Sequence, residues 1–399
     1  MPNTAPPART PSSAGGRVSH GNACLMPVLT PPSRPRGYKG GVALPRFRPL
    51  AIVVSSGLLL VALVASAAGS TATVRFTPPT HARSIDAASG TALRAERLTR
   101  AATTFRGGLV TTSTGETVDV RVSDALPIET ATPEGWAEFL TGLTHGSEIS
   151  LLTVYIATLD EVQEICGTRA LGCYSRNQLV APGDAAVPDV SPEEVVRHEY
   201  GHHIALHRLN APWVAIDWGP KNWASAADVC ARTTRKEAFP GDEGPNYARN
   251  PGEAWAEVYR LMDERKAGIT AATWPIIAPS FYPTEAALQA AERDVLQPWS
   301  AGKTTVFTRV FGKATKKVWL IPLATVLDGD LRISATVPNG GNPEIALVAA
   351  NRSTVIRRAQ WVGQRVKSLT GSVCGQRALF VRVTQGGALG RVRVSAATP

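Results

Sequence analysis

SPEEVVRHEYGHHIALHRL, residues 191–209, is the stretch of this 399-residue chain that predicts most about its fold. Ser191 is a good N-cap residue, and Pro192 suits the first position of a helix. Glu194 stands three residues after the cap, as in a capping box. The Asn-Ala-Pro sequence at residues 210–212 is the first natural stop. We therefore expect one helix that runs to about residue 209.

His198, Glu199 and His202 form the pattern H-E-x-x-H within this helix. Residues four apart project from the same helix face, so the two imidazoles can bind a single ion. Both histidines also lie in the apolar stripe of the helix, and a buried histidine pair needs a partner. The pattern predicts a zinc ion bound by His198 and His202, with Glu199 beside it. The alternative is a helix whose two histidines are satisfied by protein hydrogen bonds.

A second helix is predicted at NPGEAWAEVYRLMDE, residues 250–264, after the cap Asn250. Zinc hydrolases usually have three protein ligands and leave a fourth position open for water. Glu253 is the preferred third ligand, because a glutamate from a second helix fills this role in one class of such sites. Glu257 is an alternative ligand, or a residue that orients a histidine. Glu253 also stands where a capping box would place it, so a capping role stays open.

The positive charge of the chain lies at its two ends. The net charge is +10, and residues 1–50 contain seven Lys or Arg and no Asp or Glu. Residues 300–399 contain fifteen basic and three acidic side chains, a balance of +12, which leaves residues 51–299 near −9. A basic chain does not imply nucleic-acid binding when its charge is divided in this way. No basic motif interleaved with aromatic residues is present either, so we expect no nucleic-acid partner.

The N-terminal part predicts export. Residues 1–48 are rich in Pro, Arg, Gly and Ser and are interpreted as a disordered basic leader. Residues 49–70 contain the apolar run 50–68, which is either a cleaved signal peptide or a membrane anchor. In both cases the chain that follows is extracellular or at the cell surface. Residues 71–107, with a predicted helix over 87–103, are interpreted as a stalk or a pro-region.

Four cysteines follow the apolar run, which fits an oxidising compartment. They allow two disulfides in three possible pairings. The preferred local pair is Cys166 with Cys173, which closes a short loop. Cys230 would then pair with Cys374 and join the last hundred residues to the middle of the chain. A zinc site built from these cysteines is the alternative, but their spacing does not fit one.

The segments around the central helix predict a small mixed sheet. Alternation and apolar runs indicate strands at 115–126 and 150–162, a helix at 133–145 and a short edge strand at 177–183. This order is typical of an α+β domain in which a helix covers one face of the sheet. An edge strand beside the metal would let a peptide bind by strand addition. A short helix is also expected at 225–232.

Residues 300–399 predict a separate β-domain. About eight short runs of β-forming residues, one of them 354–362, alternate with Gly, Asn, Pro and Asp turns. This pattern is typical of a β-sandwich or jelly roll. The balance of +12 suggests attraction to an anionic cell-wall polymer or surface. The alternative is a solvated face without a partner.

Two motifs carry a resemblance to a known family. HEYGHH at 198–203, with NYARNPGEAWAEVYRLM at 246–262, resembles the zincin metallopeptidases in their gluzincin arrangement. The pattern is similar to the catalytic domain of anthrax-toxin lethal-factor-like proteases and their secreted bacterial relatives. The resemblance covers residues 108–299 and implies a zincin-like domain. It implies roles for five residues: zinc bound by His198, His202 and Glu253, Glu199 as general base, and Tyr247 as a stabiliser of the transition state.

The last hundred residues carry a resemblance of their own. LDGDLRISATVP at 327–338 and CGQRALFVRV at 374–383 are similar to the pre-peptidase-type jelly-roll domains appended to secreted bacterial peptidases. Taken together, the sequence predicts a secreted or membrane-anchored zinc endopeptidase that acts on protein or peptide. Two alternatives are a cell-surface binding or adhesion protein with a vestigial zinc site, and a zinc amidase that cuts peptidoglycan cross-links.

Overall fold

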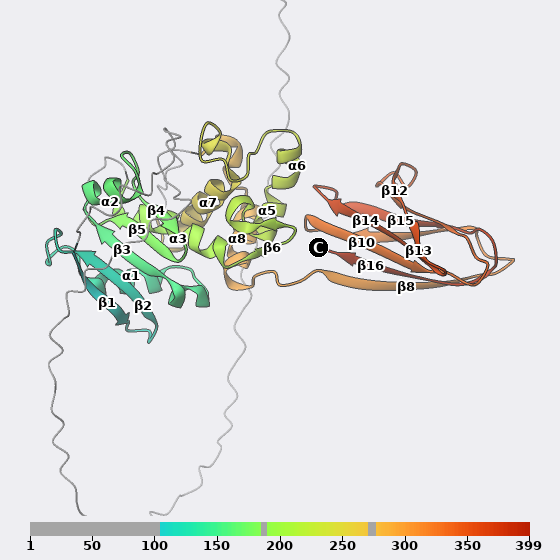
Figure 1. Ribbon diagram of the computed structural model, residues 1–399, viewed down its shortest axis with the longest axis horizontal. Coiled ribbons are helices and arrows are strands. Elements are labelled where there is room, and N and C mark those ends of the chain that lie inside the picture. The colour runs from blue at the N-terminus through green and yellow to red at the C-terminus, as the bar shows by residue number, and fades with distance from the viewer. Residues whose placement is uncertain (1–103, 185–189, 270–276) are drawn as a thin grey trace, which may run out of the picture. The chain divides into compact units, whose positions relative to one another are not determined.

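The computed structural model describes residues 104–184, 190–269 and 277–399 (Figure 1). These residues form a mixed α/β part that is followed by an all-β part. No helix among the described residues is long and apolar enough to cross a membrane. The predictions for the leader 1–48, the apolar run 50–68 and the helix 87–103 lie outside the described residues.

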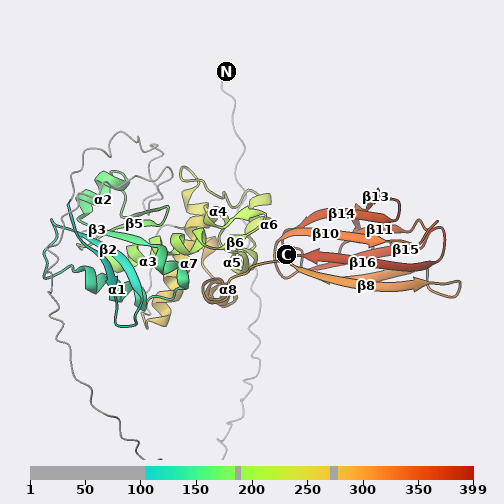
Figure 2. The same ribbon diagram turned by 60° about the horizontal axis from the view of Figure 1, so that its bottom comes forward.

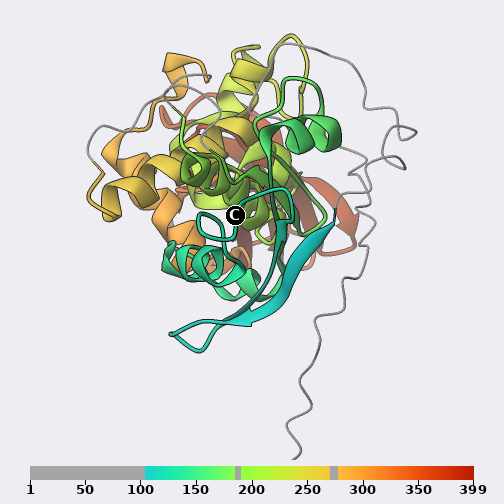
Figure 3. The ribbon, with the colours of Figure 1, turned by 90° about the vertical axis from the view of Figure 1, so that its left-hand side faces the viewer.

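The α/β part contains one mixed sheet of five strands in the order β1-β2-β3-β5-β4. β1 and β2 form an antiparallel hairpin, β2, β3 and β5 run parallel, and β4 is antiparallel to β5. Figure 3 shows the turn of the β1–β2 hairpin at the periphery of this part. β1 lies in a stretch for which the sequence predicted no strand. The strands are Phe105–Thr111 (β1), Thr117–Ser123 (β2), Thr153–Ala157 (β3), Cys173–Ser175 (β4) and Gln178–Pro182 (β5).

Helices cover both faces of this sheet. α1 (Pro133–Gly142) and α3 (Pro192–Leu206) share the larger apolar core with the strands. α2 (Leu159–Cys166) packs on the opposite face in a second, smaller core. The prediction of a single strand over 150–162 is therefore right only over Thr153–Ala157, because a 3₁₀ helix ends at Leu151 and α2 follows the strand. Thr158 ends the strand because its side chain and that of Glu161 form a capping box that starts α2.

The prediction that 177–183 is an edge strand is also wrong. β5 lies between β3 and β4, and the short strand β4 forms the edge. Residues 176 and 177, Arg and Asn, have positive φ angles of 47° and 68° and form the tight turn that joins β4 to β5. The residues before this turn, for which no strand was predicted, therefore form one edge of the sheet, and Cys173 and Tyr174 in this edge strand are buried.

The two predicted central helices are present and pack against each other. α3 starts with the predicted capping box of Ser191 and Glu194 and ends at Leu206, three residues before the predicted stop. α7 (Pro251–Lys266) lies across it, with Gly201 of α3 against Ala256 of α7. A Cβ atom at position 201 would lie 2.8 Å from the Cα atom of Ala256. Only glycine allows the helices to approach this closely, and their separation sets the geometry between their side chains.

Short helices connect and flank α3 and α7. Where one helix was predicted at 225–232, the structure has two, because Asp228 between them adopts a left-handed conformation with φ 53°. The 3₁₀ helix η2 (Ser147–Leu151) precedes β3, and one two-stranded sheet and the remaining helices complete the α/β part. They are Leu209–Asn210 (β6), Trp213–Val214 (β7), Ala215–Trp218 (α4), Lys221–Ala226 (α5), Val229–Thr234 (α6), Tyr247–Arg249 (η3), Pro279–Phe281 (η4) and Glu285–Leu296 (α8).

The C-terminal β region has two sheets, ordered β13-β14-β10-β16-β8 and β12-β11-β15-β9. Figure 2 shows the first sheet in this order. Alternate residues from both sheets form one apolar core of Val, Ile, Leu, Ala and Phe. The strands are Lys303–Phe311 (β8), Val318–Ala324 (β9), Gly329–Thr336 (β10), Glu344–Val348 (β11), Val355–Arg358 (β12), Gln360–Gly363 (β13), Val366–Val373 (β14), Ala378–Thr384 (β15) and Gly390–Thr398 (β16).

The predicted strand at 354–362 is two strands that belong to different sheets. β12 pairs with β11 and β13 pairs with β14, so the chain crosses from one sheet to the other at Ala359. Periodicity alone does not reveal such a crossing, because both short strands are largely exposed and show no alternation that would separate them.

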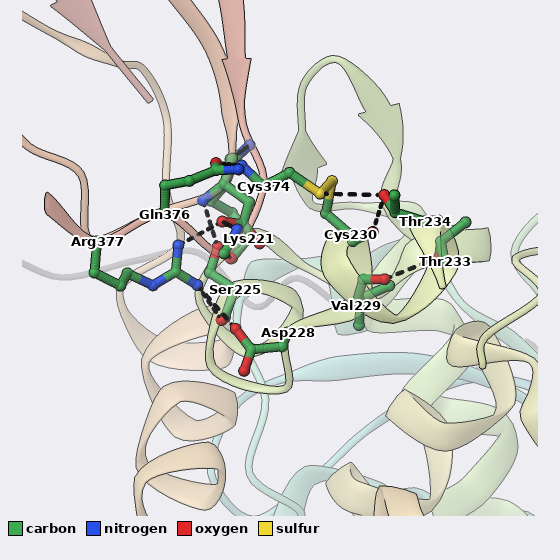
Figure 4. The surroundings of a disulfide bond; sticks show 12 residues. Lys221, Ser225, Asp228, Val229, Cys230, Thr233, Thr234, Cys374, Gln376 and Arg377 are labelled. Atoms are coloured by element: carbon green, nitrogen blue, oxygen red, sulfur yellow. Dashed lines mark hydrogen bonds and ion pairs between the residues drawn. A yellow bond between two sulfur atoms is a disulfide. The ribbon is translucent and has the colours of Figure 1, made fainter. Parts of the chain in front are cut away.

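Both predicted disulfides are present. Cys166–Cys173 closes the short loop between α2 and β4, and Cys230–Cys374 joins α6 to the C-terminal β region. Figure 4 shows the polar contacts around the second bond, where the Arg377 side chain donates to the Ser225 carbonyl and lies near the Asp228 carboxylate. The long-range disulfide is thus accompanied by several hydrogen bonds between the same two segments.

Lys221 is a fully buried lysine at this junction. Its Nζ donates to the carbonyls of Ala211 and Asp328, and lies over the rings of Trp213 and Trp299. Burial lowers the pKa of Lys221 to about 8, although nearby aspartates oppose the shift. A buried amine of this kind is sensitive to the packing of both segments.

Candidate metal centre

Three predicted ligand residues meet between α3 and α7. His198 and His202 lie one turn apart on α3, and Glu253 lies in the first turn of α7. One ligand atom from each lies within 4.8 Å of the others. The Glu253 Oε2 atom is 3.3 Å from Nε2 of His198 and 3.3 Å from Nε2 of His202. This is the one group of three or more such residues found in the described part of the chain.

The donor set fits a small tetrahedral cation. Zinc binds imidazole nitrogen and carboxylate oxygen at about 2.1 Å, which places neighbouring ligand atoms roughly 3.4 Å apart in a tetrahedron. The two measured separations of 3.3 Å agree with this spacing. Two imidazoles and one carboxylate would leave one tetrahedral position for another ligand. The residues present therefore fit a zinc ion.

The structure distinguishes between Glu253 and Glu257. Glu253 does not cap its helix, because the Asn250 side chain accepts from the Gly252 N–H and the Asn250 N–H donates to the Tyr247 carbonyl. The Glu253 carboxylate lies at the two imidazoles instead. Glu257 Oε1 is 2.8 Å from Nδ1 of His198, on the opposite side of that ring. Glu257 thus lies where it orients a histidine, not where it would bind the same ion.

A buried arginine anchors Glu257. Arg260 donates from Nη2 to Oε2 of Glu257 at 2.7 Å, and from Nη1 to Glu264 at 2.8 Å and to Glu194 at 3.3 Å. Burial alone would raise the pKa of Glu257, but His198 and Arg260 outweigh it and hold the pKa below its usual value. Hydrogen bonds thus connect Glu194 of the α3 capping box to Arg260, and Arg260 to Glu257. Glu257 in turn is hydrogen-bonded to His198.

The electrostatic field at the site favours a positive charge. Burial disfavours a charged His198, yet its hydrogen bonds to Glu253 and Glu257 outweigh burial and raise its pKa to about 10. Burial likewise opposes ionisation of Glu253, but His202 and His198 hold its pKa well below the usual value. The carboxylates around these imidazoles therefore form a buried site that stabilises a cation.

Glu199 lies next to the residue that precedes the edge strand β4. Its side chain is completely buried, and its charge contributes to the raised pKa of both His198 and Tyr247. A Cβ atom on Gly172 would lie 3.0 Å from the Glu199 Oε1 atom. The backbone just before β4 therefore approaches the glutamate closely, and a larger residue at 172 would displace it.

Tyr247, which the family resemblance suggested, lies at the same site. Its hydroxyl donates to the Glu253 Oε2 atom at 2.7 Å. Burial and the nearby carboxylates raise the pKa of Tyr247 well above its usual value, so the phenol keeps its proton. The tyrosine comes from the short helix η3, which directly precedes the cap of α7.

Sequence reasoning missed three residues that shape the site. Arg260 could have been found from its spacing, since it stands three residues after Glu257 and four before Glu264. Gly172 and Tyr174 gave no such signal. The Tyr174 hydroxyl is 3.0 Å from Nδ1 of His203, which connects β4 to the helix that carries the metal-site histidines.

Comparison with known proteins adds little. No family model matches the chain, and no curated protein matches it either. One solved structure similar to a part of the chain is the pre-peptidase C-terminal domain of a collagenase from Bacillus anthracis. It is 13% identical, the match covers 24% of this chain and 89% of that domain, and the TM-score is 0.20. A score this low carries no argument about the fold or the function of the chain.

Proposed function

We propose that this protein is an exported, zinc-dependent peptidase whose zincin-like catalytic domain lies within residues 108–299. The observation that carries the proposal is the convergence of His198, His202 and Glu253, with Oε2 of Glu253 3.3 Å from both imidazoles. Export is supported by the two disulfides, which are typical of oxidising compartments.

The surrounding residues have separate roles in this proposal. When bound, zinc supplies a water of lowered pKa and polarises a substrate carbonyl. The Glu199 carboxylate accepts a proton from the attacking water and then gives it to the leaving amine. Glu257 fixes the ring of His198 through Nδ1, which leaves Nε2 as the ligand atom. The Tyr247 hydroxyl donates its single proton to Glu253 and holds that carboxylate in place. To stabilise the transition state it would turn this donation from Glu253 to the substrate oxygen.

An extended peptide is the substrate that the local backbone fits. β4 is a sheet edge in which Cys173 and Tyr174 are buried and Ser175 is half-buried, and a Cβ atom on the preceding Gly172 would lie 3.0 Å from Glu199 Oε1. A peptide added as a further strand at this edge would pass beside the general base. This arrangement supports an endopeptidase, since strand addition recognises main chain on both sides of the cleaved bond.

A second candidate is a binding protein in which zinc only stabilises the fold. His202, Glu199 and Glu253 each have an exposed fraction of 0%, which is typical of a closed structural site. A purely structural site needs no general base, yet Glu199 lies beside the two histidines. We therefore prefer the peptidase, and the two candidates differ in one measurement.

The test is digestion of a broad peptide library by the zinc-loaded protein and by its Glu199→Gln variant. We expect the variant to retain one zinc per chain and to lose cleavage by a factor of about 10² to 10⁴, as for loss of a general base. His198→Ala should lose both zinc and cleavage. A zinc-loaded wild type that cuts no peptide would refute the peptidase and favour the binding protein. Release of peptides from purified cell-wall sacculi, without cleavage of the library, would favour the amidase.

A further inference from the structure

The outer face of the five-stranded sheet in the C-terminal β region carries three arginines. Its strands alternate between buried apolar residues and outward residues. Outward positions include Arg332 on β10 and Arg391 and Arg393 on β16, and all three side chains are exposed. We call this surface, with the hydroxyl residues between the arginines, the arginine face.

The strand register places these arginines around a row of small hydroxyl side chains. Ser334 pairs with Ser395 on one side and with Ser368 on the other, so three serines lie side by side across three strands. Arg393, opposite Thr336, lies in the neighbouring row, and Arg332, opposite Thr370, lies in the row on the other side. The serine row is therefore a strip of short polar side chains, with an arginine in the row on either side.

The side chains of the three arginines on this face make no ion pair or hydrogen bond within the described residues, in contrast to those of the other sheet. There, Arg358 and Arg382 both lie at the Glu344 carboxylate, at 2.8 Å and 3.6 Å. Asp330 is the one acidic residue among the outward positions of β8, β10, β14 and β16, and it lies at one end of the face. The arginine face is thus a region of uncompensated positive charge on a part of the chain whose balance is +12.

The chemistry of the face selects among anionic partners. Guanidinium groups bind phosphate in bidentate geometry, and serine and threonine hydroxyls bind phosphate and polyol oxygens. Arg391 and Arg393 are two residues apart on one strand, so their Cα atoms are about 7 Å apart. No aromatic residue is among the outward residues Ser334, Ser368 and Ser395 or their paired neighbours. The serine row therefore lacks the stacking platform that bases require, and Trp361, 44% exposed on β13 of the same sheet, packs against the inward Lys367.

We propose that the arginine face binds a linear, base-free polyol-phosphate polymer of the kind that cell envelopes expose. A phosphate on each short repeat matches the close spacing of Arg391 and Arg393, whereas glycans with one carboxylate per disaccharide space their charges further apart. This inference does not depend on the peptidase activity, because the face and the metal centre lie in different parts of the chain.

The test is binding of the purified full chain to poly(glycerol phosphate), measured as a function of salt. Each phosphate contact lowers the slope of log K against log salt by about 0.7 for a single-stranded polyanion. We expect the triple variant Arg332→Gln, Arg391→Gln, Arg393→Gln to bind at least tenfold more weakly. The slope of log K against log salt should become less negative by about 2. Because all three side chains are exposed and unpaired, the melting temperature should not change.

A matched control separates the face from the overall charge. Lys313, Lys316 and Lys317 are also exposed, and they lie in or beside the β8–β9 connection. The triple Lys→Gln variant removes the same charge and should keep most of the affinity. Equal loss in both triple variants would overturn the proposal, as would equal or tighter binding of single-stranded DNA or hyaluronan by the wild type.

Discussion

The α/β part and the C-terminal β region use charge in opposite ways. The α/β part buries charged side chains among its helices, with Arg260 and Asp263 only 3% and 4% exposed. The β region buries only Asp328 and Lys367 among its charged side chains, and most of its arginines are at the surface. Buried charges are costly unless each has a partner, whereas exposed charges cost almost nothing. The buried network surrounds the candidate metal centre, whereas the exposed arginines form the surface for which a partner is proposed.

The largest expected effect comes from separating the two regions. Cys230 and Cys374 are 144 residues apart in the sequence, against 7 for Cys166 and Cys173. The loop-closure model gives about 5 kcal/mol for the long loop and about 2 to 3 kcal/mol for the short one. We expect the double Cys→Ser variant of each pair to lose these amounts from the free energy of unfolding, measured with guanidinium. A larger loss of unfolding free energy for the Cys166–Cys173 variant would show that loop-closure entropy is not the main contribution of these disulfides to stability.

The next largest effect tests the buried network. Arg260→Met leaves three carboxylates without their shared guanidinium, so we expect a loss of about 4 kcal/mol in the free energy of unfolding. Zinc affinity, measured by chelator competition, should also fall, because Glu257 would no longer hold His198. In the cobalt-substituted protein the visible absorption bands should shift.

Arg265→Met is the matched control for Arg260, on the same helix. Arg265 pairs with Glu285, but their side chains are 38% and 78% exposed, so the expected loss is below about 1 kcal/mol. Equal losses of unfolding free energy in Arg260→Met and Arg265→Met would mean that the hydrogen bonds around Glu257 stabilise the fold no more than an exposed ion pair does.

A pH dependence is expected from the junction. Burial lowers the pKa of Lys221 to about 8, so between pH 8 and its usual value of 10.5 the unfolded chain binds more protons than the folded one. The free energy of unfolding should therefore rise with pH across this window, by up to roughly 3 kcal/mol from this group. Lys221→Met should lack this rise. If the free energy of unfolding changed with pH in the same way in wild type and variant, the Lys221 amine would be hydrated and its pKa would not be lowered.

The smallest effect is expected on the arginine face. Single Arg→Gln changes at 332, 391 or 393 should alter the free energy of unfolding by less than about 0.5 kcal/mol, because these exposed side chains have no partner to lose. A loss above 1 kcal/mol for any of them would show that the face contributes to folding, and the contrast between the two regions would then fail.

Local signals predicted the elements that begin with strong caps. The Ser191 capping box and the Asn250 cap gave the starts of α3 and α7 correctly, and the cysteine spacing gave both disulfides. The predicted strand at 150–162 failed because the Thr158 cap lies inside an apolar run that reads equally well as a strand. The order of strands in the sheet, with β5 inside and β4 at the edge, depends on pairings between distant segments.

The sequence by itself determined the helix with His198 and His202, since residues four apart share a helix face in any context. It left Glu253 and Glu257 as rivals, because both lie on one face of α7. Only the tertiary structure decided between them: the contact of Gly201 with Ala256 fixes how α7 crosses α3, and this places Glu253 at the Nε2 atoms and Glu257 at the Nδ1 atom of His198. Helical periodicity sets which side chains share a face, but the distance and angle between helices set which of them reaches the site.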